Sequence, residues 1–391
     1  MKKNTASDSR KTSVGREERS SANPAIVDTV VAPDRYQVIK LAIDVHSTLF
    51  VASRQLDNAT PQPPQKFTRE QLLKFIAKQL TLASRVVCCY EAGCFGYCLQ
   101  RQITALGAEC LVIAPQDWDE RKKNVRTDNT DTMAMVQRLD RYVAGNLKAL
   151  AVVRVPTLAE EVARSRVRQR QQFMSDRNRM ANRGKSLLME YGLSASWNWW
   201  NCHKWDATQK QVREQMGELA ETLLAMLRDC HDTLMAVAEK LEALTLEQQK
   251  NQKRRSELAG RKRLRGIGDL SMAVIEAEIG DWNRFGNRRQ VGSLTGLCPG
   301  VTGTGGKFTN LSVNKCGNRR LRAVLVELAW LLPRYQSGYL PLLRWKAVLA
   351  GTNRSAKKKA IVALARRLAV DLWRINTGRT TPEKLGLTLA A

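Results

Sequence analysis

The sequence has few aromatic residues and no long apolar run. Phe, Trp and Tyr together make up 6% of its 391 residues. No apolar run approaches the roughly 18–20 residues that a helix needs to span a bilayer. The N-terminus also lacks the apolar core of a secretory signal peptide. We therefore expect a cytoplasmic protein with no membrane-spanning segment.

Acidic residues are also scarce. The chain has 37 Asp and Glu residues against 64 Lys and Arg residues, which gives a formal net charge of +27. This excess is far larger than solubility requires, so it implies a polyanionic partner. Nucleic acid is the first candidate, and a membrane surface is the alternative.

The sequence lacks a recognisable zinc motif as well. It contains nine cysteines, but Cys94 and Cys98 are followed by no second pair of ligands, and the three histidines are scattered. An odd number of cysteines in a chain without a secretory signal favours reduced thiols. We expect most of them to be buried as small hydrophobic side chains.

The N-terminal part of the chain predicts a tail followed by an α/β domain. Residues 1–36 are rich in Ser, Lys, Arg, Asp and Glu, which indicates a disordered tail. Short apolar runs and helical patterns then alternate through residues 37–150. This order is typical of an α/β domain with a central sheet. We predict strands at 36–43, 49–56, 85–90 and 110–114, and helices at 69–82 and 94–106.

Residues 151–255 predict a helical linker. A basic helix is expected at 158–190 and a second helix at 208–246, where the apolar periodicity is clearest, with spacings of three and four residues. This near-heptad pattern predicts an antiparallel helical pair or a coiled coil, within one chain or with another subunit. Four tryptophans between the two helices either pack to close the hairpin tip or stack on bases. They are Trp197, Trp199, Trp200 and Trp205.

Residues 256–391 predict a mainly helical C-terminal domain. Gly266 and Gly268 stand before an expected helix. There they resemble a helix-hairpin-helix grip, in which backbone N–H groups bind phosphate, although an ordinary tight turn fits equally well. A glycine-dense loop is expected at 296–306, and a basic helix at 318–332.

Four acidic residues stand where strands end or a helix begins. Asp44 and Glu91 each directly follow an apolar run, and Asp128 and Asp131 lie three apart at an expected helix start. Residues three apart share one face of a helix, so the four carboxylates could converge. Such a cluster suits phosphodiester cleavage, because two Mg²⁺ ions roughly 4 Å apart stabilise the attacking and leaving oxygens. The alternative is a helix cap at Asp128 and a solvated strand end at Asp44.

Several short motifs occur in the same order as in one group of insertion-sequence transposases. The N-terminal part contains Ile-Asp-Val-His at 43–46, Tyr-Glu-Ala-Gly at 90–93 and Arg-Thr-Asp-Asn-Thr-Asp at 126–131. The C-terminal part contains Gly-Ile-Gly at 266–268, Gly-Leu-Cys-Pro at 296–299, Gly-Gly-Lys at 305–307 and Asn-Lys-Cys-Gly-Asn-Arg-Arg-Leu-Arg at 314–322. Over residues 38–375 the chain therefore resembles transposases with a DEDD, RuvC-like (ribonuclease H-like) domain and a C-terminal transposase domain. Piv-type DNA invertases are related to this group.

The resemblance implies a two-part active site. Asp44, Glu91, Asp128 and Asp131 correspond to the family's four acidic metal ligands, with Mg²⁺ as the cofactor. The family's C-terminal domain supplies a serine nucleophile that is thought to join DNA covalently through phosphate. In this sequence Thr304 stands at the serine position when residues 296–305 are aligned without gaps.

The threonine leaves three interpretations open. Thr304 keeps the hydroxyl and serves as the nucleophile, a neighbouring hydroxyl such as that of Thr302 serves instead, or the second site is impaired. Nearby basic side chains could bind the scissile phosphate or contact the flanking DNA backbone. They are Lys307, Lys315, Arg319 and Arg322.

The expected function is site-specific exchange of DNA strands that moves or inverts an insertion sequence, carried out by a homo-oligomer such as a dimer or tetramer. The resemblance also implies a noncoding guide RNA, a bridge RNA that pairs with donor and target DNA. Two alternatives remain. One is a structure-selective junction nuclease that uses only the acidic site and water, and the other is a non-enzymatic nucleic-acid-binding relic.

Overall fold

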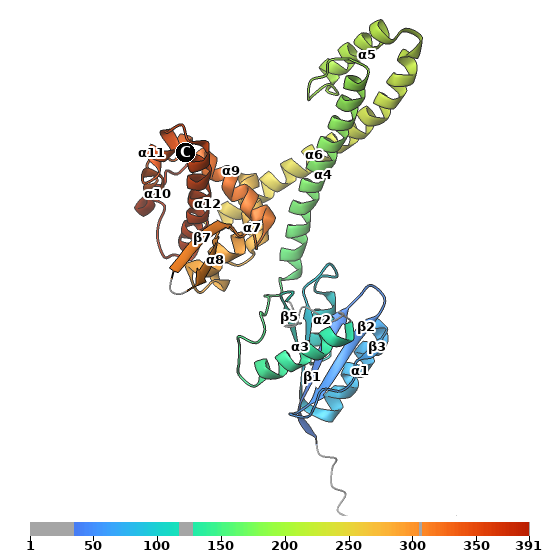
Figure 1. Ribbon diagram of the computed structural model, residues 1–391, viewed down its shortest axis with the longest axis vertical. Coiled ribbons are helices and arrows are strands. Elements are labelled where there is room, and N and C mark those ends of the chain that lie inside the picture. The colour runs from blue at the N-terminus through green and yellow to red at the C-terminus, as the bar shows by residue number, and fades with distance from the viewer. Residues whose placement is uncertain (1–34, 117–127, 305–306, 391) are drawn as a thin grey trace, which may run out of the picture. The chain divides into compact units, whose positions relative to one another are not determined.

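The structure, a computed structural model, describes residues 35–116, 128–304 and 307–390, without the side chains of Thr304, Lys307 and Asn310. The chain divides into two compact units, with the boundary between Val155 and Pro156 (Figure 1). The tail predicted for residues 1–36 lies outside the described residues, apart from its last two positions. Within the described residues, no helix combines the length and the hydrophobicity that a membrane span requires.

The first unit is built on a five-stranded sheet. β1 pairs antiparallel with β2 and parallel with β4, and β4 pairs parallel with β5. This is the α/β arrangement that the sequence predicts. The strands, in spatial order, are β3 (Gln65–Phe67), β2 (Phe50–Leu56), β1 (Tyr36–Val45), β4 (Ala83–Glu91) and β5 (Glu109–Ile113). The described helices of this unit are α1 (Arg69–Leu82), α2 (Cys98–Ala105) and α3 (Asp128–Val143).

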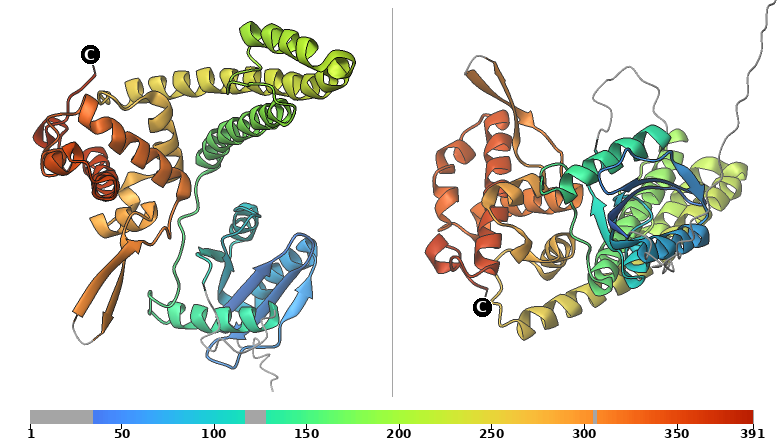
Figure 2. Two further views of the ribbon diagram at one scale, coloured as in Figure 1. Left: turned by 45° about the horizontal axis from the view of Figure 1, so that its top comes forward. Right: turned by 90° about the horizontal axis from the view of Figure 1, so that it is seen from below.

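The two faces of the sheet are covered by different helices (Figure 2). Side chains alternate between the two faces along a strand. Leu41 and Ile43 of β1 accordingly pack with residues of α1 and α2, whereas Ala42 packs with residues of α3. Asp44 comes two residues after Ala42 and therefore lies on the face that α3 covers.

A buried lysine holds α3 against the sheet. Lys40 of β1 lies on the same face as Ala42, and its Nζ forms an ion pair with Asp140 of α3. The same Nζ donates a hydrogen bond of 2.7 Å to the backbone oxygen of Asp57. A buried ammonium group is costly unless it is paired, so these contacts fix where α3 lies on the sheet.

The second unit begins with an antiparallel pair of long helices, α4 and α6. Arg166 near the start of α4 forms an ion pair with Glu247 near the end of α6. Leu188 near the end of α4 packs in one cluster with Leu223 near the start of α6. The predicted antiparallel helical pair is therefore present. The elements are α4 (Leu158–Glu190), α5 (Cys202–Met216), η1 (Gly217–Leu219) and α6 (Ala220–Leu258).

The prediction of one continuous helix over 208–246 is wrong. Gly217 ends α5 with φ 54° and ψ −125°, a backbone conformation that residues with a side chain rarely adopt. The chain turns there, and α6 starts at Ala220. The apolar periodicity continues across the break because both helices pack in the same cluster.

The tip of the helical pair is closed by packed tryptophans. Trp199 is buried, and its Nε1 donates a hydrogen bond of 2.9 Å to the backbone oxygen of Ala181. Gly184 leaves room for the indole, because a Cβ at this position would lie 2.0 Å from Cζ2 of Trp199. Trp205 stacks on His231 with ring centroids 4.4 Å apart. For Trp199 and Trp205 the structure therefore supports packing rather than base stacking.

The rest of the second unit packs around a hydrophobic core formed mainly by α7, α8, α9 and α12. The basic helix predicted at 318–332 is present as α9. The loop predicted at 296–306 is wrong for Pro299–Thr304, because the threonines and Val301 favour extended backbone and form the first strand of a hairpin. Its last two positions, Gly305 and Gly306, lie outside the described residues. The elements are α7 (Asp269–Ile279), η2 (Trp282–Arg284), α8 (Arg288–Thr295), β6 (Pro299–Thr304), β7 (Lys307–Val313), α9 (Arg319–Tyr335), α10 (Leu340–Leu343), α11 (Lys346–Ala350), α12 (Arg354–Asn376) and η3 (Glu383–Leu385).

The cysteines are less buried than predicted. Burial raises the pKa of the Cys88 and Cys89 thiols, and it raises the pKa of Cys110 to about 12. Cys230 is also buried. The prediction that most cysteines are buried is nevertheless wrong, because only three of the nine, Cys88, Cys89 and Cys230, are buried. Cys110 and Cys298 are partly exposed, and four stand in loops or at helix starts on the surface. The exposed ones are Cys94, Cys98, Cys202 and Cys316.

Candidate active site

Two neighbouring parallel strands end in acidic residues, Asp44 and Glu91. Asp44 directly follows Ile43, Glu91 directly follows Tyr90, and Ile43 and Tyr90 are partners in the register of β1 and β4. Glu91 alternates with Cys89, which packs on the α3 side of the sheet. Asp44 and Glu91 therefore stand on adjacent strand ends and on the same face.

α3 brings Asp128 to this end of the sheet. The helix packs across β1 and β2. In its first turns, the Thr132 hydroxyl accepts a hydrogen bond of 3.0 Å from the Ser53 hydroxyl of β2. The Thr132 hydroxyl also donates to the backbone oxygen of Asp128 at 3.0 Å. Buried contacts therefore set the place at which the helix begins.

Asp44, His46 and Asp128 form one cluster of possible metal ligands. Nε2 of His46 lies 3.2 Å from Oδ2 of Asp44 and 3.3 Å from Oδ2 of Asp128. One ligand atom of each residue lies within 4.8 Å of the other two. All three side chains are partly open to solvent, so a substrate could reach them. His46 is not among the site residues predicted from the sequence, although its place two residues after Asp44 puts it beside the same strand end.

Glu91 and Asp131 are outside this cluster of ligand atoms, as far as the described part of the chain goes. Oε1 of Glu91 accepts a hydrogen bond of 3.2 Å from the backbone N–H of Gln116. Asp131 lies in the first turn of α3, like Asp128. The structure thus brings two of the four predicted acidic residues together with a histidine, and it places the other two on the adjacent strand end and in the same helix turn.

The candidate nucleophiles stand on the β6–β7 hairpin. Thr304 is the last residue of β6, and its backbone pairs with that of Lys307, the first residue of β7. The side chains of both lie outside the described part. Thr302 is exposed and pairs with Thr309 on β7. The two candidate hydroxyl residues are therefore two positions apart on one strand.

The basic residues near the hairpin differ in their contacts. Nη1 of Arg322 donates hydrogen bonds to the backbone oxygens of Thr295, at 3.2 Å, and Lys315, at 3.0 Å. Arg322 therefore ties the segment before β6 to the loop before α9. Lys315 and Arg319 are exposed, so their charges face solvent.

Of the two glycines in the predicted phosphate grip, Gly266 has a structural role. It has a φ of 81°, and a Cβ there would lie 2.5 Å from Cβ of Tyr335 on α9. Gly268 is the N-cap of α7, and a Cβ there would meet no atom within 4 Å. Turn geometry and packing therefore explain Gly266, while the backbone at Gly268 is open to a ligand.

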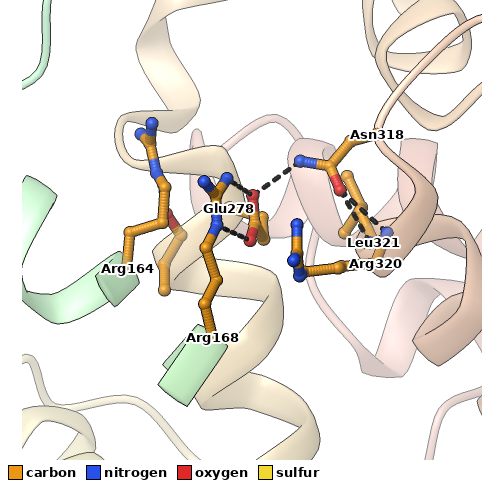
Figure 3. Close-up of polar contacts among 7 residues, drawn as sticks. Arg164, Arg168, Glu278, Asn318, Arg320 and Leu321 are labelled. Atoms are coloured by element: carbon orange, nitrogen blue, oxygen red, sulfur yellow. Dashed lines mark hydrogen bonds and ion pairs between the residues drawn. The ribbon is translucent and has the colours of Figure 1, made fainter. Parts of the chain in front are cut away.

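A buried carboxylate links α4 to the residue that precedes α9 (Figure 3). The side chain of Glu278 on α7 is 1% exposed, and Arg168 of α4 donates hydrogen bonds of 2.9 Å to both of its oxygens. Nδ2 of Asn318 donates to Oε2 of Glu278 at 2.6 Å. Burial acts to raise the pKa of Glu278, but the hydrogen bonds from Arg168 and Asn318, together with the positive charges of Arg168 and Arg164, outweigh burial and lower this pKa. Glu278 is therefore held in its charged form.

Part of the second unit is similar to a known protein family. The family described as "Transposase IS116/IS110/IS902 family" matches residues 262–340. This stretch contains α7, α8, the β6–β7 hairpin and α9. It therefore includes Thr304, Glu278 and the contacts of Arg322.

Known proteins are also similar along most of the chain. A putative transposase of Sinorhizobium fredii, y4rJ, is 32% identical over 316 residues, which cover 74% of this chain and 76% of that protein. The transposase for insertion sequence element IS1328 of Yersinia enterocolitica is 25% identical over 353 residues, which cover 89% of this chain and 99% of that protein. The transposase for insertion sequence element IS1111A of Coxiella burnetii is 24% identical over 288 residues, which cover 72% and 75% of the two chains. The chain therefore belongs to the IS116/IS110/IS902 family of transposases.

Proposed function

We propose that the chain is an insertion-sequence transposase that cleaves and exchanges DNA strands. The metal ions for this reaction would be held at the carboxyl ends of strands β1 and β4 in its first unit. The observation that carries this proposal is the cluster of Asp44, His46 and Asp128, with Glu91 on the adjacent strand end. A mixed sheet whose central strands end in acidic residues is what a RuvC-like, ribonuclease H-like domain with a DEDD site is expected to have.

The donor atoms of the cluster suit a divalent cation. Carboxylate oxygens are the ligands that Mg²⁺ prefers, so Asp44, Glu91, Asp128 and Asp131 are the residues that would hold it. When bound, the metal stabilises negative charge on the attacking and leaving oxygens. Imidazole nitrogen suits transition metals better than Mg²⁺. We therefore assign His46 the role of orienting Asp44 and Asp128, which it already contacts.

The second part of the proposed site is a hydroxyl on β6. Thr304 stands where the family has a serine. Its hydroxyl would attack the phosphorus, lose its proton and release a sugar oxygen as a free hydroxyl, which leaves DNA joined to the protein through phosphate. Exposed cations such as Lys315 and Arg319 can stabilise the added negative charge on that phosphate.

The proposed partners are DNA and a noncoding guide RNA. The similar proteins are named transposases of insertion sequences, which makes DNA the expected substrate. A net charge of +27 suits DNA and RNA equally. The bridge RNA is proposed on the family resemblance alone.

We propose that the chain forms a homo-oligomer through exposed apolar residues of the helical pair. Met235 and Leu246 of α6 are exposed although they are apolar, and their separation of eleven residues places them on the same side of the helix. Apolar side chains on the open side of a long helix are suited to coiled-coil pairing with another subunit.

A junction nuclease is the second candidate function. It needs only the acidic cluster and a water molecule as the nucleophile. The side chains of this cluster are described, whereas the side chain of Thr304 lies outside the described residues. The two candidates differ in their products, because only strand exchange through Thr304 forms a protein–DNA adduct.

The test is strand cleavage by the full chain on DNA that carries the ends of an insertion sequence, with Mg²⁺ added or withheld. Asp44→Asn and Asp128→Asn should abolish cleavage and leave DNA binding in a gel-shift assay largely intact. Glu70→Gln is the matched control, because Glu70 is an exposed carboxylate on α1 in the same unit. An adduct supports strand exchange, and free ends without an adduct support the nuclease. Cleavage that needs no Mg²⁺, or that survives Asp44→Asn, would refute the proposed metal site.

A further inference from the structure

The β6–β7 hairpin extends away from the helices of the second unit (Figure 2). Its base is closed by a backbone hydrogen bond of 3.0 Å from the N–H of Asn314 to the oxygen of Cys298. An isolated two-stranded hairpin is only marginally stable in water. A hairpin that stands away from the core is therefore expected to gain order from a partner. Its paired residues include Val301 with Asn310, Thr302 with Thr309, and Gly303 with Phe308.

Phe308 presents an uncovered ring on one face of this hairpin. It is 79% exposed, the largest exposed fraction of any aromatic side chain in the described residues. Its partner on the opposite strand is Gly303, which has no side chain to cover the ring. Val301 shares this face by alternation and is exposed as well. Covering a large exposed apolar ring with a partner removes apolar surface from water, which lowers the free energy.

The surroundings of the ring indicate a polyanionic partner. No acidic residue stands between Asp281 and Glu327 in the sequence. A second copy of this chain would bring the same positive charges to the hairpin, so electrostatics favour nucleic acid over self-pairing. The exposed cationic residues of α8, which precedes the hairpin, and of the segment that follows it are Arg288, Arg289, Lys315 and Arg319.

We infer that Phe308 stacks on an unpaired DNA base beside the site of strand transfer. The inference rests on the proposed function for its substrate, DNA. Aromatic side chains stack on any base, and a base is available for stacking where the duplex is opened. Strand exchange requires such an opening, because a strand must leave one partner to join another. Gly303 and Phe308 form the register pair next to Thr304 and Lys307. Because successive pairs face opposite sides of a hairpin, the stacked base would lie one residue pair from Thr304, on the other face of the hairpin.

The test compares binding of the full chain to two DNA duplexes that differ only in an unpaired bulge containing 2-aminopurine. The parent protein should bind the bulged duplex more tightly, and the 2-aminopurine fluorescence should change when Phe308 stacks on it. Phe308→Ala should weaken binding to the bulged duplex by roughly 5- to 100-fold. Binding to the paired duplex rests on phosphate contacts and should stay within about twofold. Phe308→Trp should restore both the preference and the fluorescence change.

Leu311→Ala is the matched control, because Leu311 is exposed on the same strand but lies on the other face of the hairpin. It should behave like the parent, and an equal loss in Leu311→Ala would mean that the effect comes from the folding of the hairpin and not from stacking. Equal binding of the two duplexes by the parent, or an unchanged preference in Phe308→Ala, overturns the inference. A change of oligomer mass in Phe308→Ala on sedimentation would show instead that this face contacts a second copy. Salt-dependent binding without a bulge preference refutes this inference alone, whereas no binding to either duplex refutes the proposed function as well.

Discussion

Arg168 of α4 and Glu278 of α7 form a bidentate ion pair in which each oxygen of a buried carboxylate accepts a hydrogen bond of 2.9 Å. Asn318 donates to the same carboxylate, and its Oδ1 accepts hydrogen bonds from the backbone N–H groups of Arg320 and Leu321 (Figure 3). One amide therefore caps α9 and contacts Glu278 at the same time. The carboxylate thus connects α4, α7 and the start of the helix that follows the β6–β7 hairpin.

Loss of Arg168 should destabilise the second unit. Arg168→Ala leaves the buried carboxylate of Glu278 without its two charged hydrogen bonds, and breaking a buried pair costs roughly 3 kcal/mol. Arg166→Ala is the matched control, because Arg166 and Glu247 form an ion pair with side chains 44% and 41% exposed. An exposed pair contributes about 0–1 kcal/mol. Urea unfolding followed by tryptophan fluorescence measures both variants, and equal losses would contradict the role given to Glu278.

Acid should weaken the same contact. The pKa of Glu278 is lowered in the folded chain, so its charged form contributes stability that is fully present above its ordinary value of 4.5 and is lost as the pH falls through the lower, folded value. Glu278→Gln does not titrate, so it should be less stable than the parent near neutral pH and should lose less stability on acidification. Thermal unfolding at a series of pH values measures this. Parallel stability curves for the two proteins would rule out Glu278 as the responsive group.

A side chain at position 184 should destabilise the helical pair, because Trp199 occupies the space beside Gly184. In Gly184→Ala the new Cβ would lie 2.0 Å from Cζ2 of Trp199, so the indole must leave its place and lose its hydrogen bond to Ala181. Overpacking of this kind costs roughly 1–3 kcal/mol, and the clash here is severe enough to exceed the gain in helix propensity of up to about 1 kcal/mol. Ser186→Ala, at an exposed position of the same helix, should change the free energy of unfolding by less than about 0.5 kcal/mol. A red shift of tryptophan emission should accompany only the Gly184 variant.

The regular elements of the first unit could be predicted from the sequence. The helix predicted at 69–82 coincides with α1, and the strand predicted at 49–56 differs from β2 by one residue. Apolar runs and helical periodicity bounded by polar residues mark these elements. The three residues of β3 have no such pattern, because they extend only through pairing with β2. The β6–β7 hairpin was missed for a related reason, since its glycines are typical of loops.

The site could be predicted only in part. Asp44 and Glu91 were found because they follow apolar runs, and the parallel pairing of β1 and β4 then makes them neighbours. The contact of His46 with Asp128 depends on where α3 lies, which is set by buried contacts far along the chain. The contacts of Arg322 could not be predicted from the sequence either, because its guanidinium binds two backbone oxygens that only the folded loops bring together.

Thr304 should carry the covalent link to DNA. Thr304→Ala removes the hydroxyl and should eliminate the protein–DNA adduct, whereas DNA binding should persist. Thr304→Ser keeps the hydroxyl and removes the methyl group that crowds an in-line attack, so it should preserve or raise the rate of adduct formation. Denaturing gels of the full chain with end-labelled DNA measure the adduct.

Thr302 and Thr309 supply the competing candidate and the control for this experiment. Thr309 is an exposed hydroxyl on the facing strand, so Thr309→Ala should form the adduct at the parental rate. Thr302 stands on the same strand as Thr304, with only Gly303 between them. If Thr304→Ala recombines at the parental rate while Thr302→Ala does not, the nucleophile is Thr302. If DNA is cleaved by the parent and by both variants without any adduct, water is the nucleophile, and the acidic cluster of Asp44, His46 and Asp128 acts as a junction nuclease.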